Sequence, residues 1–215
     1  NNGPAVNITV TVNPTPRIYP VPGNSIQCDN TATNIRLQSP SSFTSGSITF
    51  KFTAAATGGV TGFTPSASGL ANDHVIADVL VNPTDIPQTV TYMITPVSQI
   101  GCIDGPSVNV TVTVNPTPRV FPVPSASIQC DSTTTNITLQ SPSTFTSGVV
   151  TFNYTATATG GVTGFTASTT GLANNHVIAD KLINPTDVPQ TVTYHVIPVS
   201  PSGCHNGPAV NITVT

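Results

Sequence analysis

Four cysteines are the residues of this 215-residue chain whose type and spacing most clearly indicate chemistry. Cys28 and Cys102 lie 74 residues apart, and Cys130 and Cys204 repeat that spacing. An even number of cysteines with no Cys-x-x-Cys pair is typical of disulfides formed in an oxidising compartment, not of zinc. We therefore expect two disulfides, with Cys28–Cys102 and Cys130–Cys204 as the favoured pairs. Each would stabilise the fold by roughly 3–5 kcal/mol if chain entropy dominates.

A second pairing stays open. In a strict seven-strand sandwich the first and last turns lie at opposite ends, and a disulfide needs Cα atoms within about 7 Å of each other. Cysteines of successive units would then pair with each other.

Histidines give no repeated catalytic pattern. His74 and His176 are equivalent, but both lie in apolar stretches beside valine and isoleucine. His195 and His205 have no histidine at the equivalent positions of the first unit. Because no Ser-His-Asp or Cys-His arrangement recurs, we predict no catalytic residue and no enzymatic activity.

Aspartates are the other candidate ligands. Carboxylate oxygens suit calcium, and Asp78, Asp85, Asp180 and Asp187 recur in pairs. A single carboxylate among neutral neighbours is a weak site, and turn capping also accounts for Asp85. The glycine-rich stretch 57–62 lacks the Gly-Lys-Ser/Thr of a phosphate-binding loop. We therefore expect no metal and no cofactor, and keep the four aspartates as weak calcium candidates.

The elements that must position these residues are organised by one motif. Val10-Thr-Val-Asn-Pro-Thr-Pro-Arg17 returns as residues 112–119, an offset of 102 residues that holds without insertion or deletion. Each copy closes a run of alternating apolar and polar residues, the pattern of a strand with one buried face. Asn-Pro-Thr-Pro then ends the strand, because proline cannot donate to a ladder. The motif predicts the last strand of a domain followed by a short stiff linker.

This motif divides the chain into a unit at 13–114, a unit at 115–215 and a leading segment at 1–12. The leading segment matches residues 103–114, so we interpret it as the last strand of a preceding unit and the chain as a fragment. Its apolar face is expected to be covered by another protein surface. We expect it to dock on the first domain or to add as a strand to a neighbouring molecule.

Period-two patterns between turn residues predict about seven strands in each unit. In the first unit we place them at 17–21, 34–38, 47–53, 60–63, 74–81, 88–95 and 105–114. The residues expected to face inward are Ile35, Leu37, Ile48, Phe50, Phe52, Val90, Tyr92 and Ile94, with Val150, Phe152, Tyr154 and Tyr194 in the second unit. No window has a sustained helical period. We predict an all-β protein of two tandem immunoglobulin-like Greek-key β-sandwiches with negligible helix.

Composition excludes some classes of partner. Charged residues are 6% of the chain and the formal net charge is −3, so there is no basic patch for nucleic acid or an anionic membrane surface. No apolar run approaches the length of a transmembrane helix, so we expect no membrane insertion.

Three stretches resemble a known family. They are Gln-Cys-Asp-x-Thr-x-Thr-Asn-Ile, Gln-Thr-Val-Thr-Tyr-x-Ile-x-Pro-Val-Ser and the Gly-Pro-x-Val-Asn run that ends in Asn-Pro-Thr-Pro. These stretches are similar to the PKD-like repeats of giant Bacteroidota cell-surface adhesins. Those of flavobacterial gliding motility are the most similar. The family's usual Cys-Ser-Gly appears as Cys28-Asp-Asn and Cys130-Asp-Ser. The resemblance covers essentially the whole chain.

The resemblance implies a structural and adhesive module of a long secreted filament on the outer-membrane surface. It implies export by type IX secretion and contact with the gliding machinery through other parts of the parent protein. The expected partners of this part are neighbouring repeats and a surface polysaccharide or abiotic substratum. A carbohydrate-binding or enzyme-accessory sandwich is the alternative. Because the chain has no Trp, only the pairs Tyr19/Phe121, Phe43/Phe145 and Phe63/Phe165 are left to form an aromatic platform.

Overall fold

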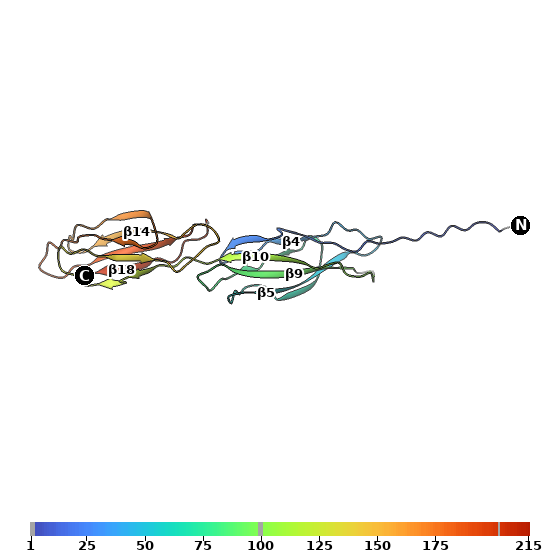
Figure 1. Cartoon of the computed structure of the whole chain (residues 1–215), viewed down its shortest axis with the longest axis horizontal. Helices are drawn as coiled ribbons and strands as arrows, with labels where there is room; N and C mark the ends of the chain where they lie inside the picture. The colour runs from blue at the N-terminus through green and yellow to red at the C-terminus, as the bar shows by residue number, and fades with distance from the viewer. Residues whose placement is uncertain (1–2, 99–100, 202) are drawn as a thin grey trace.

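The computed structural model describes residues 3–98, 101–201 and 203–215. Two β-sandwich domains lie end to end along the long axis, and an extended N-terminal segment projects from the first (Figure 1). The described residues contain strands and no helix, which confirms the all-β prediction. Accordingly, none of the described residues belongs to a helix long and apolar enough to cross a membrane.

The first domain has a three-stranded sheet in the order β1-β4-β7, a five-stranded sheet in the order β2-β10-β9-β5-β6, and the short pair β3-β8. Their bounds are β1 Tyr19–Val21, β2 Ser25–Cys28, β3 Thr31–Ala32, β4 Ile35–Gln38, β5 Ile48–Ala56, β6 Ser66–Leu70, β7 Val75–Ile76, β8 Val79–Leu80, β9 Gln88–Ser98 and β10 Val108–Asn115. Among the described residues of this domain, every strand pairing is antiparallel except that of β2 with β10, which is parallel.

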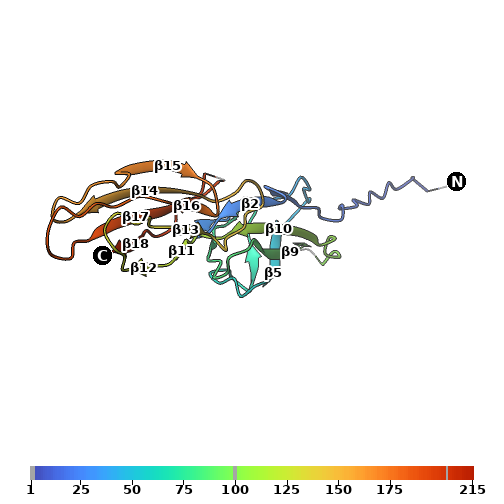
Figure 2. The same ribbon diagram turned by 60° about the vertical axis from the view of Figure 1, so that its left-hand side comes forward.

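The second domain repeats this arrangement, with sheets β11-β13-β16 and β12-β18-β17-β14-β15. Its strands are β11 Phe121–Val123, β12 Ala126–Ser127, β13 Ile137–Gln140, β14 Thr151–Ala158, β15 Ser168–Leu172, β16 His176–Ile178, β17 Val192–Val199 and β18 Val210–Val214. Strand β12 runs parallel to β18, close to the C-terminus (Figure 2).

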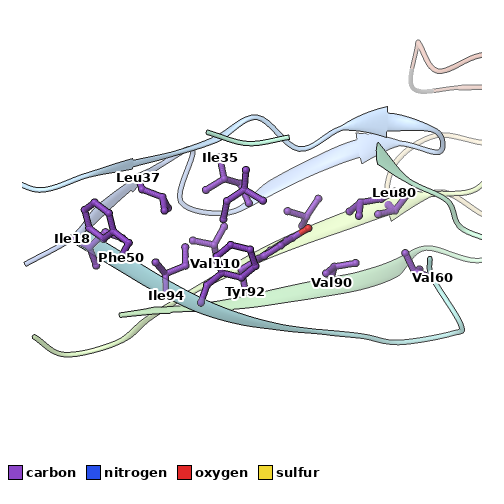
Figure 3. Close-up of a cluster of buried hydrophobic side chains, with 14 of the residues drawn as sticks. Ile18, Ile35, Leu37, Phe50, Val60, Leu80, Val90, Tyr92, Ile94 and Val110 are labelled. Carbon is purple, nitrogen blue, oxygen red and sulfur yellow. The ribbon is translucent and has the colours of Figure 1, made fainter. Parts of the chain in front are cut away.

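Each domain has its own core between the two sheets. The alternating residues of β4, β5, β9 and β10 point into the first core, where Leu37, Phe50 and Tyr92 are fully buried (Figure 3). The second core contains the equivalent Leu139, Phe152 and Tyr194. Every residue predicted to face inward is buried, because a period-two pattern has only one register that buries its apolar face.

Three strand predictions need correction. The strand expected at 17–21 is shortened to β1, and β2, which was not predicted, follows it and joins the other sheet. The stretch 60–63 forms only an isolated bridge from Thr61 to Val81, while β6 follows it. The expected strand at 74–81 divides because the Thr33 hydroxyl donates to Ile76 O and accepts from Asp78 N, which separates β7 from β8.

The N-terminal segment does not dock on the first domain. Val6, Ile8, Val10 and Val12 are 78–87% exposed, although their counterparts in β10 are buried or half-buried. The described part of this segment, residues 3–12, forms no strand. The expected contact with the first domain is therefore wrong for this structure.

Candidate functional site: the interdomain junction

The junction begins at the last residue of β10. Asn115 is almost fully buried, its amide oxygen accepts from Thr146 N at 3.0 Å, and its amide nitrogen donates to the Thr146 hydroxyl at 3.1 Å. Asn115 therefore ends a strand of the first domain and also fixes a loop of the second. Pro116 and Pro118, which follow it, are buried and have restricted φ angles. The linker is short and stiff.

A disulfide crosses this junction. Cys28 is bonded to Cys204, with the Cα atoms 5.4 Å apart, and the described Cys102 and Cys130 are free and exposed. Cys28 reaches the junction because β2 runs parallel to β10 and places Cys28 beside Asn115. Cys204 reaches it because it precedes β18, whose approach at Gly207 passes over the carbonyl of Pro118.

The favoured pairs Cys28–Cys102 and Cys130–Cys204 are therefore wrong, and the pairing between successive units is found. The reason is the direction of β10. Cys28 lies at its C-terminal end, whereas Cys102 precedes its N-terminal end at Val108. At about 3.3 Å per residue the strand alone separates these ends by roughly 23 Å, well beyond the reach of a disulfide.

An ion pair also crosses the junction. Asp85, in the turn after β8, accepts hydrogen bonds from both Nε and Nη2 of Arg119, with Nε at 2.7 Å. The Ser143 hydroxyl donates to the same carboxylate at 3.3 Å, and the backbone carbonyl of Asp85 accepts from Thr144 N. The hydrogen bond from Arg119 holds the pKa of the Asp85 carboxyl below its usual value. A bidentate pair of this kind fixes orientation as well as distance.

Asp29 connects the first domain to the linker. One carboxylate oxygen accepts from Asn82 N at 2.7 Å, and the other accepts from the Thr117 hydroxyl of the linker at 2.7 Å. The side chain of Asn82 donates to Val114 O at 2.9 Å, at the end of β10. Covalent, ionic and hydrogen bonds thus converge on one short linker. This arrangement holds two domains in a fixed relation.

The calcium candidates do not come together. Asp78 accepts from Thr64 N, the Thr64 hydroxyl and the Tyr92 hydroxyl at 2.7–2.9 Å, and Asp180 repeats these contacts with Thr166 and Tyr194. Asp85 binds Arg119, and Asp187 is exposed. Among the described residues no three acidic, histidine or cysteine side chains form a group that could hold a metal. Three of the four carboxylates have structural donors as partners.

Histidines and aromatic residues are also dispersed. His74 is exposed, and His176 is half-buried in β16. The ring of His195 contacts the Asn211 side chain at 2.8 Å, and His205 lies next to the disulfide in sequence. Phe43, Phe63, Phe145 and Phe165 pack against the cores. Only Tyr19 and Phe121 remain as exposed aromatic candidates, at 57% and 52%.

The junction residues other than cysteine were not recognised from sequence. Asp29, Arg119 and Ser143 had no predicted role, and Asp85 was assigned to turn capping or calcium. One signal points to them. In a chain with few charges, only four charged positions recur in both units, namely Arg17/Arg119, Asp29/Asp131, Asp78/Asp180 and Asp85/Asp187. Three of these four contribute to the junction.

The family is shown by sequence comparison. A family model described as a PKD-like domain matches residues 25–118 and 127–215. The chain belongs to this PKD-like domain family. The two matches correspond to the two sandwiches, so the molecule is a tandem pair of PKD-like domains. No curated protein sequence matches the chain.

Three solved structures are similar to this chain at low sequence identity. Drosophila N-cadherin EC1-3 is 14% identical, with a TM-score of 0.33 over 94% of this chain and 67% of that one. The fibronectin(III)-like modules of Clostridium thermocellum CbhA are 9% identical, with a TM-score of 0.30 over 93% of both chains. Chicken CNTN1 FN1-FN3 domains are 12% identical, with a TM-score of 0.33 over 92% of this chain and 65% of that one.

Proposed function

We propose that these PKD-like domains are structural and adhesive repeats of a long secreted filament at the cell surface, of the kind used in gliding motility. In this role they transmit traction between the cell surface and a substratum. The observation that carries the proposal is the junction, where Cys28–Cys204 and Asp85–Arg119 fix one domain against the next. Domains that only bound ligands independently would not need a covalent bond between them.

Two further features support this role. A disulfide favours an oxidising compartment outside the cytoplasm, in agreement with an outer-membrane-associated, type IX-secreted protein. Surfaces with few charges and repeated units allow many weak contacts to add up along a filament. The proposed partners are neighbouring repeats and a polysaccharide or abiotic substratum.

Bead adhesion tests the proposal. Beads coated with the purified chain would be placed on glass, agarose and polysaccharide under flow, with an unrelated two-domain sandwich as control. Retention above the control that soluble chain competes away would make these domains adhesive themselves. Retention equal to the control would leave them as spacers and would refute the adhesive half of the proposal.

A carbohydrate-binding or accessory role is the second candidate, and one observation favours it. Tyr19 and Phe121 are exposed at equivalent positions, and Arg17 and Arg119 precede them by two residues. Arg119 lies over the Phe121 ring at 5.8 Å. Aromatic rings stack on sugar rings. Tyr19→Ala with Phe121→Ala should abolish polysaccharide retention if this role is correct, whereas the buried-side variant Phe43→Leu should not change it.

A further inference from the structure

Each residue that forms the junction has a counterpart 102 residues away at an end of the molecule. At the far end of the second domain, the counterparts of Cys28, Asp29 and Asp85 are Cys130, Asp131 and Asp187, and all three are exposed. At the near end of the first domain, the counterparts of Cys204, Arg119 and Ser143 are Cys102, Arg17 and Ser41. One end therefore carries the first half of a junction, and the other end carries the second half.

We propose that these two ends are complementary docking faces, and that the face around Cys130 and Asp187 binds the face around Cys102 and Arg17 of another PKD-like domain of this type. A second copy of this chain is such a partner. In the docked form Cys130 is disulfide-bonded to the partner's Cys102, and Asp187 pairs with the partner's Arg17. The proposal rests on the proposed function in one respect, that the domains act in series.

The face around Cys130 and Asp187 has the same charged and apolar groups as the first domain's side of the junction, but here they are unpaired or more exposed. Among the described residues, Asp187 and Arg17 have no ion-pair partner, although their counterparts Asp85 and Arg119 bind each other. Ile128 is 90% exposed where its counterpart Ile26 is 63% exposed. Asn184 is half-buried, whereas its counterpart Asn82 is buried.

A groove lies on the second domain where the linker covers the equivalent surface of the first. It has a volume of about 360 Å³ and its wall includes Cys130, Asp131, Asn184, Gln190, Val192 and Val214. In the first domain the equivalent surface is covered by the linker, where the hydroxyl of Thr117 binds Asp29 and Pro116 is buried. At the near end of the first domain, Pro14 and Thr15 are the counterparts of Pro116 and Thr117, and both are exposed. The groove therefore fits an Asn-Pro-Thr-Pro-Arg segment such as residues 13–17.

The N-terminal segment supports a partner of the same kind. Residues 3–11 are identical to residues 207–215, which contain β18. The described part of the segment that precedes Asn13 thus has the sequence of the last strand of a domain like the second one, although it forms no strand here. It is exposed and unpaired among the described residues, so it leaves the face around Arg17 open.

The covalent step needs a two-electron oxidant, and a small-molecule disulfide supplies it. The Cys130 thiolate attacks a sulfur of the small disulfide and releases one small thiol. The partner's Cys102 thiolate then attacks the mixed disulfide at the Cys130 sulfur and releases the second small thiol. The two protons lost by the cysteines end on the two released thiols. Because the two faces differ, the contact is heterologous and can extend without closing.

The test uses two full-length variants, Cys102→Ser and Cys130→Ser, with oxidised and reduced glutathione as the redox buffer. Each variant keeps one face with its thiol, and both keep Cys28–Cys204. Alone, each should stay monomeric. Mixed, they should give a one-to-one dimer in roughly tenfold excess over either homodimer, and peptide mapping should find Cys130 bonded to Cys102.

A charge exchange tests the noncovalent part. Asp187→Arg in the Cys102→Ser variant should lower the dimer yield, and Arg17→Asp in the Cys130→Ser partner should restore it. Homodimers in equal yield, or a yield that charge reversal does not change, would overturn the proposal. If the variants form no mixed dimer but the coated beads adhere, the docking proposal is refuted and the proposed function is kept.

Discussion

At the scale of single residues, a half-buried carboxylate in each domain accepts a hydrogen bond from a buried tyrosine. Burial raises the pKa of the Tyr92 hydroxyl well above its usual value, and the hydrogen bond it donates to Asp78 adds to this effect. Burial likewise raises the pKa of Tyr194, which donates to Asp180. Each tyrosine thus connects the core to the loop that carries Thr64 or Thr166.

Replacing Tyr92 with phenylalanine should destabilise the first domain by about 1–3 kcal/mol, because the Asp78 carboxylate loses a donor and keeps its desolvation cost. A tyrosine whose folded pKa is raised stabilises the fold below its unfolded pKa, about 10, and this contribution is lost as pH rises further. Urea denaturation should therefore show a loss of stability above about pH 10 that Tyr92→Phe reduces. Tyr19→Phe, at an exposed ring, is the matched control and should change neither quantity. An equal effect of both substitutions would contradict the assignment.

The Asp85–Arg119 pair predicts how the junction responds to acid. The folded pKa of Asp85 is lowered, so the pair stabilises the junction above the usual carboxyl pKa, and this contribution is lost as pH falls through the lowered folded value. In the reduced protein, small-angle scattering should show a wider spread of interdomain angles near pH 3 than near pH 7.

Two variants control this measurement. Asp85→Asn should already have the wide spread at neutral pH and respond little to acid, because it has no carboxylate to protonate. Asp187→Asn removes the exposed counterpart and should behave as the unmodified chain does. The same acid response in Asp85→Asn would show that another group controls the junction.

At the scale of elements, the linker and the last strand of each domain pass so closely that only glycine fits between them. A Cβ at Gly207 would lie 1.7 Å from Pro118 O, and one at Gly105 would lie 1.9 Å from Pro16 O. Gly3, their counterpart in the N-terminal segment, has nothing within 4 Å of a Cβ. The three positions share one sequence context and differ only in whether a domain surrounds them.

Alanine at Gly207 or Gly105 should therefore destabilise the chain by about 1–3 kcal/mol or more, as overpacking against backbone does. Gly3→Ala should change the unfolding free energy by less than about 0.5 kcal/mol. Thermal and chemical denaturation of the three variants measure this directly. A similar loss in all three would trace the effect to glycine itself and not to the contact with the linker.

Alternation in the sequence predicted the elements whose pattern is local. β4, β5 and β9 each have an inward face of buried residues, and these residues were placed correctly. β2 and β6 were missed because pairing, and not pattern, makes them strands. Ile26 in β2 is mostly exposed, and β6 is a Ser-Ala-Ser-Gly-Leu edge strand that pairs with β5.

The same limit applies to the junction. Two cysteines per unit predicted a disulfide, but the choice of partner depends on which end of the sandwich each cysteine reaches. That depends on the parallel pairing of β2 with β10, which joins residues more than 80 apart in sequence. The recurrence of Arg17/Arg119 and Asp85/Asp187 was visible in the sequence, and only the fold shows that the two positions meet across a domain boundary.

At the scale of the whole molecule, Cys28–Cys204 bridges 176 residues and changes the route that force takes through the chain. A pull on the two ends runs from the N-terminus to Cys28, crosses the disulfide to Cys204 and continues to Thr215. Residues 29–203, which include most of both cores, lie outside this load path.

Single-molecule stretching should measure the hidden length. In the oxidised protein the segment between the two cysteines cannot extend. Reduction should release about 600 Å of additional contour length, at about 3.4 Å per residue. Cys28→Ser should extend like the reduced protein, while Cys102→Ser should extend like the oxidised one. Full extension without reduction would rule out this load path.

Unfolding of either sandwich therefore need not lengthen the tether. Under tension the maximum length of the oxidised molecule is set by the disulfide, because residues 29–203 cannot extend. The folded domains hold the two ends in their native arrangement. Reducing conditions would break this disulfide and make the same chain extensible.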